Sequence, residues 1–132
     1  MIYILDNLAP ILAAMLAGAV VGLIALRLGG RVRPGPARLA IAVLALFWLA
    51  AILAGGLILA PPQVRAQAGD WTIALGTPAI IWAGFVLPVC AASLPVLGRS
   101  GNTTLAVAGV WLAVMLTMGA VMQAVGLVAP QG

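Results

Sequence analysis

The sequence predicts an all-α, polytopic membrane protein, built as a bundle of four transmembrane helices. Four long apolar stretches, at residues 8–26, 39–60, 78–97 and 105–127, contain no Asp, Glu, Lys, Arg or His. At a rise of about 1.5 Å per residue, each stretch is long enough to cross a hydrocarbon core of roughly 30 Å. The chain of 132 residues is 65% hydrophobic and 6% charged, which is too apolar for a soluble domain. We expect a single membrane domain over residues 1–132.

The composition also limits the chemistry that the chain can carry. All six basic residues are Arg, the acids are Asp6 and Asp70, and His, Glu and Lys are missing. A zinc site needs several His, Cys or carboxylate ligands, and a membrane haem usually needs His. We therefore predict no metal, no cofactor and no catalytic residue. The single cysteine, Cys90, lies within an apolar stretch, where a thiol acts as a small apolar group.

The first stretch, residues 8–26, is expected to be a true span. The residues before it carry Asp6 and no basic residue, unlike the start of a cleavable secretory signal. Ala14, Gly18 and Gly22 recur at every fourth position and predict a smooth face for close helix contact, because small residues let helix backbones approach in bilayers.

The second stretch, residues 39–60, ends where Pro61 and Pro62 cannot continue a helix. It repeats the small-residue spacing with Ala51 and Gly55. Residues 63–76 are the longest polar connection, and we predict an interfacial loop on the outer face of the membrane. Trp71 in this loop is suited to the headgroup level.

The third stretch, residues 78–97, is predicted to begin with Thr77 as N-cap and Pro78 at the first helical position. Pro88 lacks an N–H group and crowds the carbonyl of Gly84, so we expect a kink over Gly84 to Pro88. Such a break can form a substrate site in a transporter. The interpretation that it is structural is favoured, because no charged group lies near it.

The fourth stretch, residues 105–127, is predicted to begin after Asn102 as N-cap. Gly109 with Ala113, and Gly119 with Ala120, supply further small-residue pairs. Most of the small-residue faces are expected to hold the four helices of this chain together, and the sequence leaves open that at least one of them binds another subunit. A stripe of sulfur-containing side chains at helical spacing is expected to be adaptable packing and not a copper site: it comprises Met115, Met118 and Met122.

Polar side chains in the spans are few. Gln123, near the outer end of the fourth stretch, is expected either to form a hydrogen bond between helices or to reach water. Trp82 and Trp111 either stack on an apolar ring such as a quinone or carotenoid, or pack between helices.

The arginines predict the topology. Five of the six lie in the first and third connections, and basic loops face the cytoplasm. This places both termini on the periplasmic side of a bacterial inner membrane. The five are expected to contact anionic lipid or an acidic partner, and not nucleic acid, since membrane headgroups are nearer: they are Arg27, Arg31, Arg33, Arg38 and Arg99.

Two segments, WAGFVLP at residues 82–88 and WLAVMLTMGA at residues 111–120, carry a resemblance to a known family. They resemble small bacterial four-helix membrane proteins catalogued as domain of unknown function 1761, which have a "GF" pair in the third span and an "MGA"-like end to the fourth. The chain departs from that family at Ala25, Leu26 and Arg27, where aromatic and polar residues are expected. The resemblance implies a fold and a membrane location, and no activity.

These observations favour a non-enzymatic accessory or scaffold subunit that packs against a larger inner-membrane complex, for example a respiratory or photosynthetic one. The expected partners are membrane lipids and other integral membrane subunits or a second copy. The alternative is a small transporter or permeability protein for a neutral or apolar solute, with the third span as a gate. A cavity near Gly84, Pro88 and Ser93 would favour it.

Overall fold

The computed structural model describes residues 2–29 and 35–128, and every regular element in these two ranges is a helix. Three long helices are α2 (Leu8–Leu28), α3 (Pro36–Ile58) and α7 (Gly101–Val125). A fourth column is formed by α5 (Asp70–Ile81), a π-helical turn η1 (Trp82–Val86) and α6 (Leu87–Val96). All four are long and apolar enough to cross a membrane. The predicted all-α fold, with four helices of membrane-spanning length and composition, is thus confirmed.

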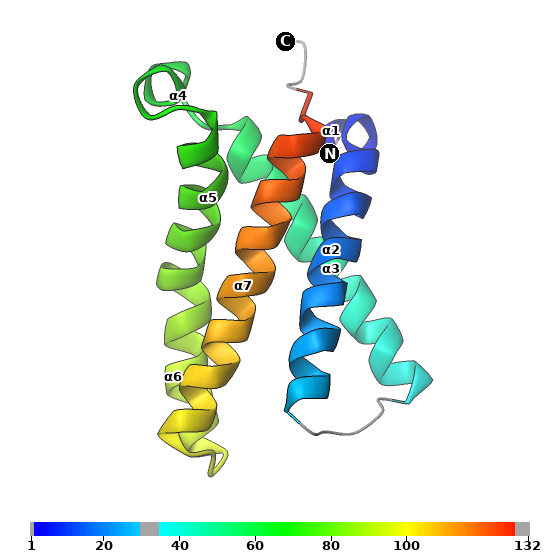
Figure 1. Cartoon of the computed structure of the whole chain (residues 1–132), viewed down its shortest axis with the longest axis vertical. Helices are drawn as coiled ribbons and strands as arrows, with labels where there is room; N and C mark the ends of the chain where they lie inside the picture. The colour runs from blue at the N-terminus through cyan, green and yellow to red at the C-terminus, as the bar shows by residue number, and fades with distance from the viewer. Residues whose placement is uncertain (1, 30–34, 129–132) are drawn as a thin grey trace.

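The central helix of the bundle is α7, which packs against α2 on one side and against α5 on the other (Figure 1). α3 crosses behind α2, and its N-terminal half then diverges from the other helices (Figure 1). Two short helices, α1 (Ile2–Asp6) and α4 (Pro62–Ala68), lie at the end of the molecule where the chain termini are found (Figure 1). We call this end of the bundle the terminal half and the opposite end the arginine half.

The core lies in the terminal half. The three methionines predicted to form a packing stripe are fully buried there on α7, together with Ile11 of α2 and Leu53 of α3. Small side chains of α2 and α3 complete this core, as is typical where membrane helices lie close together; they are Ala14, Ala50, Ala51 and Ala54.

The helix boundaries correct the prediction for the third span. α5 begins at Asp70 and not at Pro78, so Thr77 is not an N-cap and Pro78 lies inside the helix. The expected loop over residues 63–76 is replaced by α4, a turn at Gly69 with φ of 81°, and the first turns of α5. Gly69 adopts this left-handed conformation without a Cβ penalty, and Asp70 then complements the positive end of the α5 dipole.

The interior proline of α5 lies where α7 comes very close. Pro78 has no N–H for the carbonyl of Ala74, four residues earlier. That oxygen lies against Gly119 of α7, where a Cβ atom would collide with it and stand 2.7 Å from Pro78 Cγ. The missing side chain of Gly119 therefore makes room for the proline ring and for the Ala74 carbonyl.

The start of α7 differs from the prediction by two residues. Ser100 is the N-cap, and its Oγ accepts a hydrogen bond from the Thr103 N–H at 3.3 Å. Asn102 instead lies in the first turn. The two candidates are close in sequence, and both are favourable cap residues.

The remaining ends shift by a few residues. α2 extends to Leu28, while α3 begins at Pro36, where a fixed φ suits the first helical turn, and ends at Ile58. Pro61 and Pro62 follow α3 as expected.

The predicted disruption over Gly84 to Pro88 takes the form of the π-helical turn. The Leu87 N–H donates to Trp82 O, five residues earlier, and α6 then continues the column with Pro88 in its first turn. A π-helical turn of this kind re-forms the hydrogen bonding just before a residue that cannot donate.

Candidate functional site

The small residues on α2 divide into an internal and an external part. Ala14 and Gly18 are buried, and a Cβ on Gly18 would stand 2.5 Å from Met118 Cε and 3.2 Å from Val114 Cγ1. Gly22, one turn further, has open space on its Cβ side. The predicted stripe is therefore an α2–α7 contact that ends before Gly22.

The pair on α3 is internal. Ala51 is buried, and a Cβ on Gly55 would stand 3.3 Å from Tyr3 Oη. The Tyr3 hydroxyl points to the carbonyl of Ala51 at 3.5 Å. Gly56 beside them faces α5, where the methyl group of Thr77 would lie 3.1 Å from a Cβ. These positions join α1, α3 and α5.

Of the two small-residue pairs on α7, Gly109 with Ala113 lies on the outside of the bundle. Gly109 has open space where a Cβ would be, and both Gly109 and Ala113 are exposed, as is Ala106 on the same side of the helix. We call Ala106, Gly109 and Ala113 the α7 small-residue face. No other described element of the chain covers it.

Trp82 is a link between helices. Its indole N–H donates to the carbonyl of Ala108 at 2.8 Å, which joins the π-helical turn to α7. Trp111 is half-buried and packs against the core cluster. For Trp82, packing between helices is the interpretation that the contacts support.

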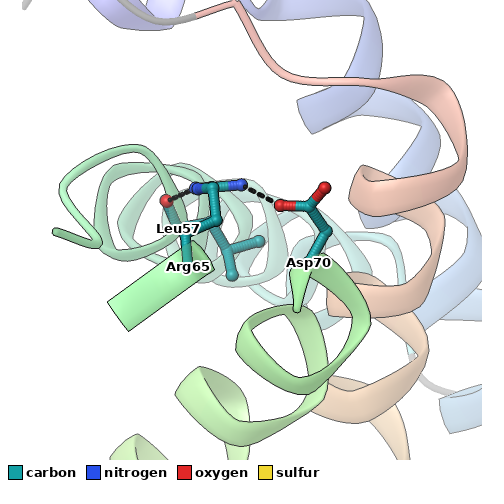
Figure 2. Close-up of polar contacts among 3 residues, drawn as sticks. All are labelled: Leu57, Arg65 and Asp70. Carbon is teal, nitrogen blue, oxygen red and sulfur yellow. Dashed lines mark hydrogen bonds and ion pairs between the residues drawn. The ribbon is translucent and has the colours of Figure 1, made fainter. Parts of the chain in front are cut away.

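In the terminal half, the side chain of Arg65 connects the end of α3 to the start of α5 through polar contacts (Figure 2). Arg65 on α4 donates from Nη1 to Asp70 Oδ1 at 3.0 Å and from Nη2 to the carbonyl of Leu57 at 2.7 Å. The carbonyl belongs to the last turn of α3, and Asp70 belongs to the first turn of α5. Both charged side chains are partly exposed, so the ion pair contributes less than about 1 kcal/mol to stability. Its role is to fix α4 between the two helix ends.

A cavity of about 430 Å³ lies beside this bridge, and its lining includes Arg65, Asp70 and Gln123. Gln123, near the C-terminal end of α7, is half-buried and makes no hydrogen bond to a described residue. The predicted interhelical bond of Gln123 is therefore absent from the described residues.

Among the described residues, the Asn7 side chain makes three hydrogen bonds, and the sequence pattern did not point to it. Asn7 is fully buried, and its Nδ2 donates to the carbonyls of Tyr3 and Val128, each at 2.9 Å. Its Oδ1 accepts from the Val128 N–H at 2.7 Å. The two bonds to Val128 hold the segment after α7 against the start of α2. The only sequence signal was an amide at the edge of a long apolar stretch.

The arginine half has exposed arginines and no acidic residue beside them among the described residues. Arg27, Arg38 and Arg99 are exposed, and none of the three pairs with an acid among the described residues. Arg31 and Arg33 lie outside the described residues. Beside the start of α3 is an apolar groove of about 620 Å³. Its walls are Pro36, Leu39, Ala40, Val43, Leu44 and Phe47 of α3, with Leu12 and Met15 of α2.

The region proposed as a gate is open surface. Gly84, Pro88 and Ser93 are exposed, and the Ser93 hydroxyl donates to the carbonyl of Val89 in its own helix at 2.6 Å. Neither of the two cavities described above includes these residues. The transporter interpretation thus gains no support from the local geometry.

Comparisons with protein-family models, with curated proteins and with solved structures found no match. The resemblance to domain of unknown function 1761 accordingly stays a prediction.

Proposed function

We propose that this chain is a non-enzymatic accessory or scaffold subunit of a bacterial inner membrane, and that it packs against a larger assembly such as a respiratory or photosynthetic complex. The observation that carries the proposal is the α7 small-residue face. Small residues are concentrated where membrane helices touch. Here the central helix of the bundle directs three of them away from its own neighbours.

The internal small residues supply the comparison that makes this face informative. Gly18 and Gly119 each meet a neighbouring helix so closely that a Cβ would collide. The chain thus uses small residues for close helix contact wherever its own helices meet. By the same physics, Gly109 and Ala113 suit a helix from another protein or from a second copy.

The absence of charged side chains from the apolar stretches favours a packing role over transport or catalysis. Proton relays and ion pathways in membranes are usually built on Asp, Glu, Lys, Arg or His. Asp6 and Asp70 both lie outside the four apolar stretches of the sequence, so proton-coupled transport has no obvious carrier.

The proposed orientation places the arginine half on the cytoplasmic side and both termini in the periplasm. Arg27, Arg38 and Arg99 belong to one end of the bundle, and the termini belong to the other (Figure 1). Basic residues near span ends are retained in the cytoplasm.

The experiment is purification of the epitope-tagged chain from native membranes in a gentle detergent. We expect recovery in a complex with other integral membrane proteins or as a homo-oligomer. Gly109→Leu should abolish that recovery, because it places a bulky side chain on the contact face without a clash inside the chain. The matched control is Gly84→Leu on the third column, where a side chain also has open space.

Recovery of the unaltered protein only as a lone monomer would contradict the proposal. Equal loss of the complex in both variants would also contradict the assignment of the α7 small-residue face.

A further inference from the structure

The cavity beside the ion pair of Arg65 and Asp70 has both polar and apolar walls. They come from the end of α3, from α4, from the start of α5 and from the end of α7 with the residues after it. The volume of about 430 Å³ lies within the range of small-molecule sites, roughly 300–1,000 Å³. The polar residues of the lining are Arg65, Asp70 and Gln123, and the apolar ones include Leu57, Ile73 and Leu127. A ligand that matches both parts of this lining is amphipathic.

The polar groups of the cavity keep unused hydrogen-bonding capacity. A guanidinium has an N–H on Nε and two on each terminal nitrogen. The bonds from Arg65 to Asp70 Oδ1 and to the Leu57 carbonyl use one N–H of Nη1 and one of Nη2. Asp70 Oδ2 accepts no hydrogen bond from a described residue. The amide of Gln123 also has no partner there, and its polar atoms are not buried. A ligand can therefore bind both charged groups without breaking the ion pair (Figure 2).

The cavity lies where the apolar columns of the bundle end. Ile58, which lines it, is the last residue of α3, and the third candidate span begins at Asp70. Trp71, the next residue, is 55% exposed, and such amphipathic rings favour the headgroup level of a bilayer. Ile73 lies about one turn further into the apolar column. The polar part of the cavity thus lies at the depth of lipid headgroups, and its apolar part adjoins the hydrocarbon.

The charge of the lining selects among headgroups. Arg65 and Asp70 offset each other, and no other charged residue lines the cavity. A phosphatidylethanolamine headgroup carries a phosphate and an ammonium group with N–H donors, so it can form a charge-assisted hydrogen bond to each member of the pair. Phosphatidylcholine has the same two charges but no N–H donor for the carboxylate. Phosphatidylglycerol has no positive charge for it.

We propose that this cavity binds phosphatidylethanolamine. The phosphate accepts hydrogen bonds from the free N–H groups of Arg65, and the ammonium group donates to Asp70 Oδ2. The Gln123 amide bonds to the ester region, and one acyl chain passes Ile73 and Leu127. This inference does not depend on the proposed subunit role, because it concerns the chain alone in lipid.

The test uses the purified full-length protein and three lipids with the same acyl chains: phosphatidylethanolamine, phosphatidylcholine and phosphatidylglycerol. Bound lipid is counted by native mass spectrometry across a concentration series. We expect phosphatidylethanolamine to bind most tightly. Asp70→Asn should weaken its binding about tenfold, as expected for a hydrogen bond to a charged group. The same variant should bind phosphatidylglycerol at least as well as before, because Arg65 is then left without an acid. A variant that only disturbed the fold would lose all three lipids alike.

Two further pairs of variants leave the ion pair intact. Gln123→Leu should weaken phosphatidylethanolamine binding about fivefold through one lost hydrogen bond, whereas Gln67→Leu should leave it unchanged. Ala60→Phe should fill the cavity and lower the binding, whereas Ala66→Phe should not. Both controls are exposed positions on α4 that do not line the cavity, in contrast to Gln123 and Ala60. The acyl-free headgroup, glycerophosphoethanolamine, should bind far more weakly than the whole lipid.

Three results would overturn the proposal: equal binding of the three lipids, an equal loss of all three in Asp70→Asn, or equal effects of Gln123→Leu and Gln67→Leu. Binding of glycerophosphoethanolamine as tight as that of the lipid would overturn it too, and would assign the cavity to a soluble zwitterion. Co-purification with other proteins does not enter any of these readouts, so the subunit proposal stands or fails separately.

Discussion

The two ends of the bundle are built in different ways. In the terminal half, α2, α3 and α7 bury five large apolar or sulfur-containing side chains completely, and α5 joins them through Pro78. In the arginine half, Cys90, Thr104 and Ala108 are the buried residues of α6 and the first half of α7, and the adjoining parts of α2 and α3 have none.

This difference separates what the chain does for itself from what it offers to its surroundings. Helices in a bilayer gain little by hiding apolar surface from lipid, so their association depends on close packing and on hydrogen bonds. Both are concentrated in the terminal half, where Asn7, Tyr3 and Arg65 add polar links between elements. The arginine half contains the exposed cations and the α3 wall of the groove, and the α7 small-residue face begins there.

The largest expected loss of stability comes from adding a side chain where α5 and α7 are in close contact in the terminal half. Gly119→Ala places a methyl group against a backbone oxygen of Ala74 and the ring of Pro78. Overpacking typically costs 1–3 kcal/mol, and backbone yields less readily than a side chain, so we expect about 3 kcal/mol lower free energy of unfolding. The measurement is reversible unfolding in mixed micelles.

Gly109→Ala is the matched control for that variant, since open space lies beside Gly109. It should leave the purified chain at least as stable, because Ala is the better helix former. Equal destabilisation by the two substitutions would remove the distinction between internal and external small-residue contacts.

A smaller effect is expected from one substitution made in each half of the same helix. Leu53 is fully buried and Leu44 is 66% exposed. Leu53→Ala should lower the free energy of unfolding by about 2 kcal/mol through the cavity that it leaves. Leu44→Ala should change it by less than about 0.5 kcal/mol, as surface substitutions usually do. The same micelle unfolding assay measures both, and a large loss at Leu44 would show that the first half of α3 packs more tightly than its exposure indicates.

The four spans and the main packing stripe could be predicted from the sequence, because composition and periodicity act locally. The four apolar stretches, the stop before Pro61 and Pro62, and the methionine packing stripe follow from local residue types. The start of α5 could not be found in this way. Pro78 is a sound first helical residue by propensity, but in the structure it lies inside α5 and packs against Gly119 of α7, which is distant in sequence.

The sequence also could not show which small residues of a stripe contact another helix of the chain. Ala14, Gly18 and Gly22 share a spacing, but which of them meets another helix depends on where α2 and α7 separate. Gly18 lies before that point and Gly22 lies after it. The spacing of small residues therefore predicted that contact faces exist. Where the helices cross decides which residues of such a face meet another helix of the same chain.

The smallest of the three stability effects should come from the polar link between the chain ends. Asn7→Ala removes three hydrogen bonds and leaves the backbone of Val128 without its partner just before α2. A buried group left unsatisfied costs roughly 1–3 kcal/mol, but the segment after α7 is near the end of the bundle and can turn to water. We therefore expect about 1 kcal/mol lower stability, together with faster proteolytic cleavage after Val125. Asn102→Ala is the control, since Asn102 is exposed in the first turn of α7. Unchanged cleavage in the Asn7 variant would mean that the contacts of α7 with α2 and α5 already hold the terminal half together, and that the link between the chain ends contributes little to it.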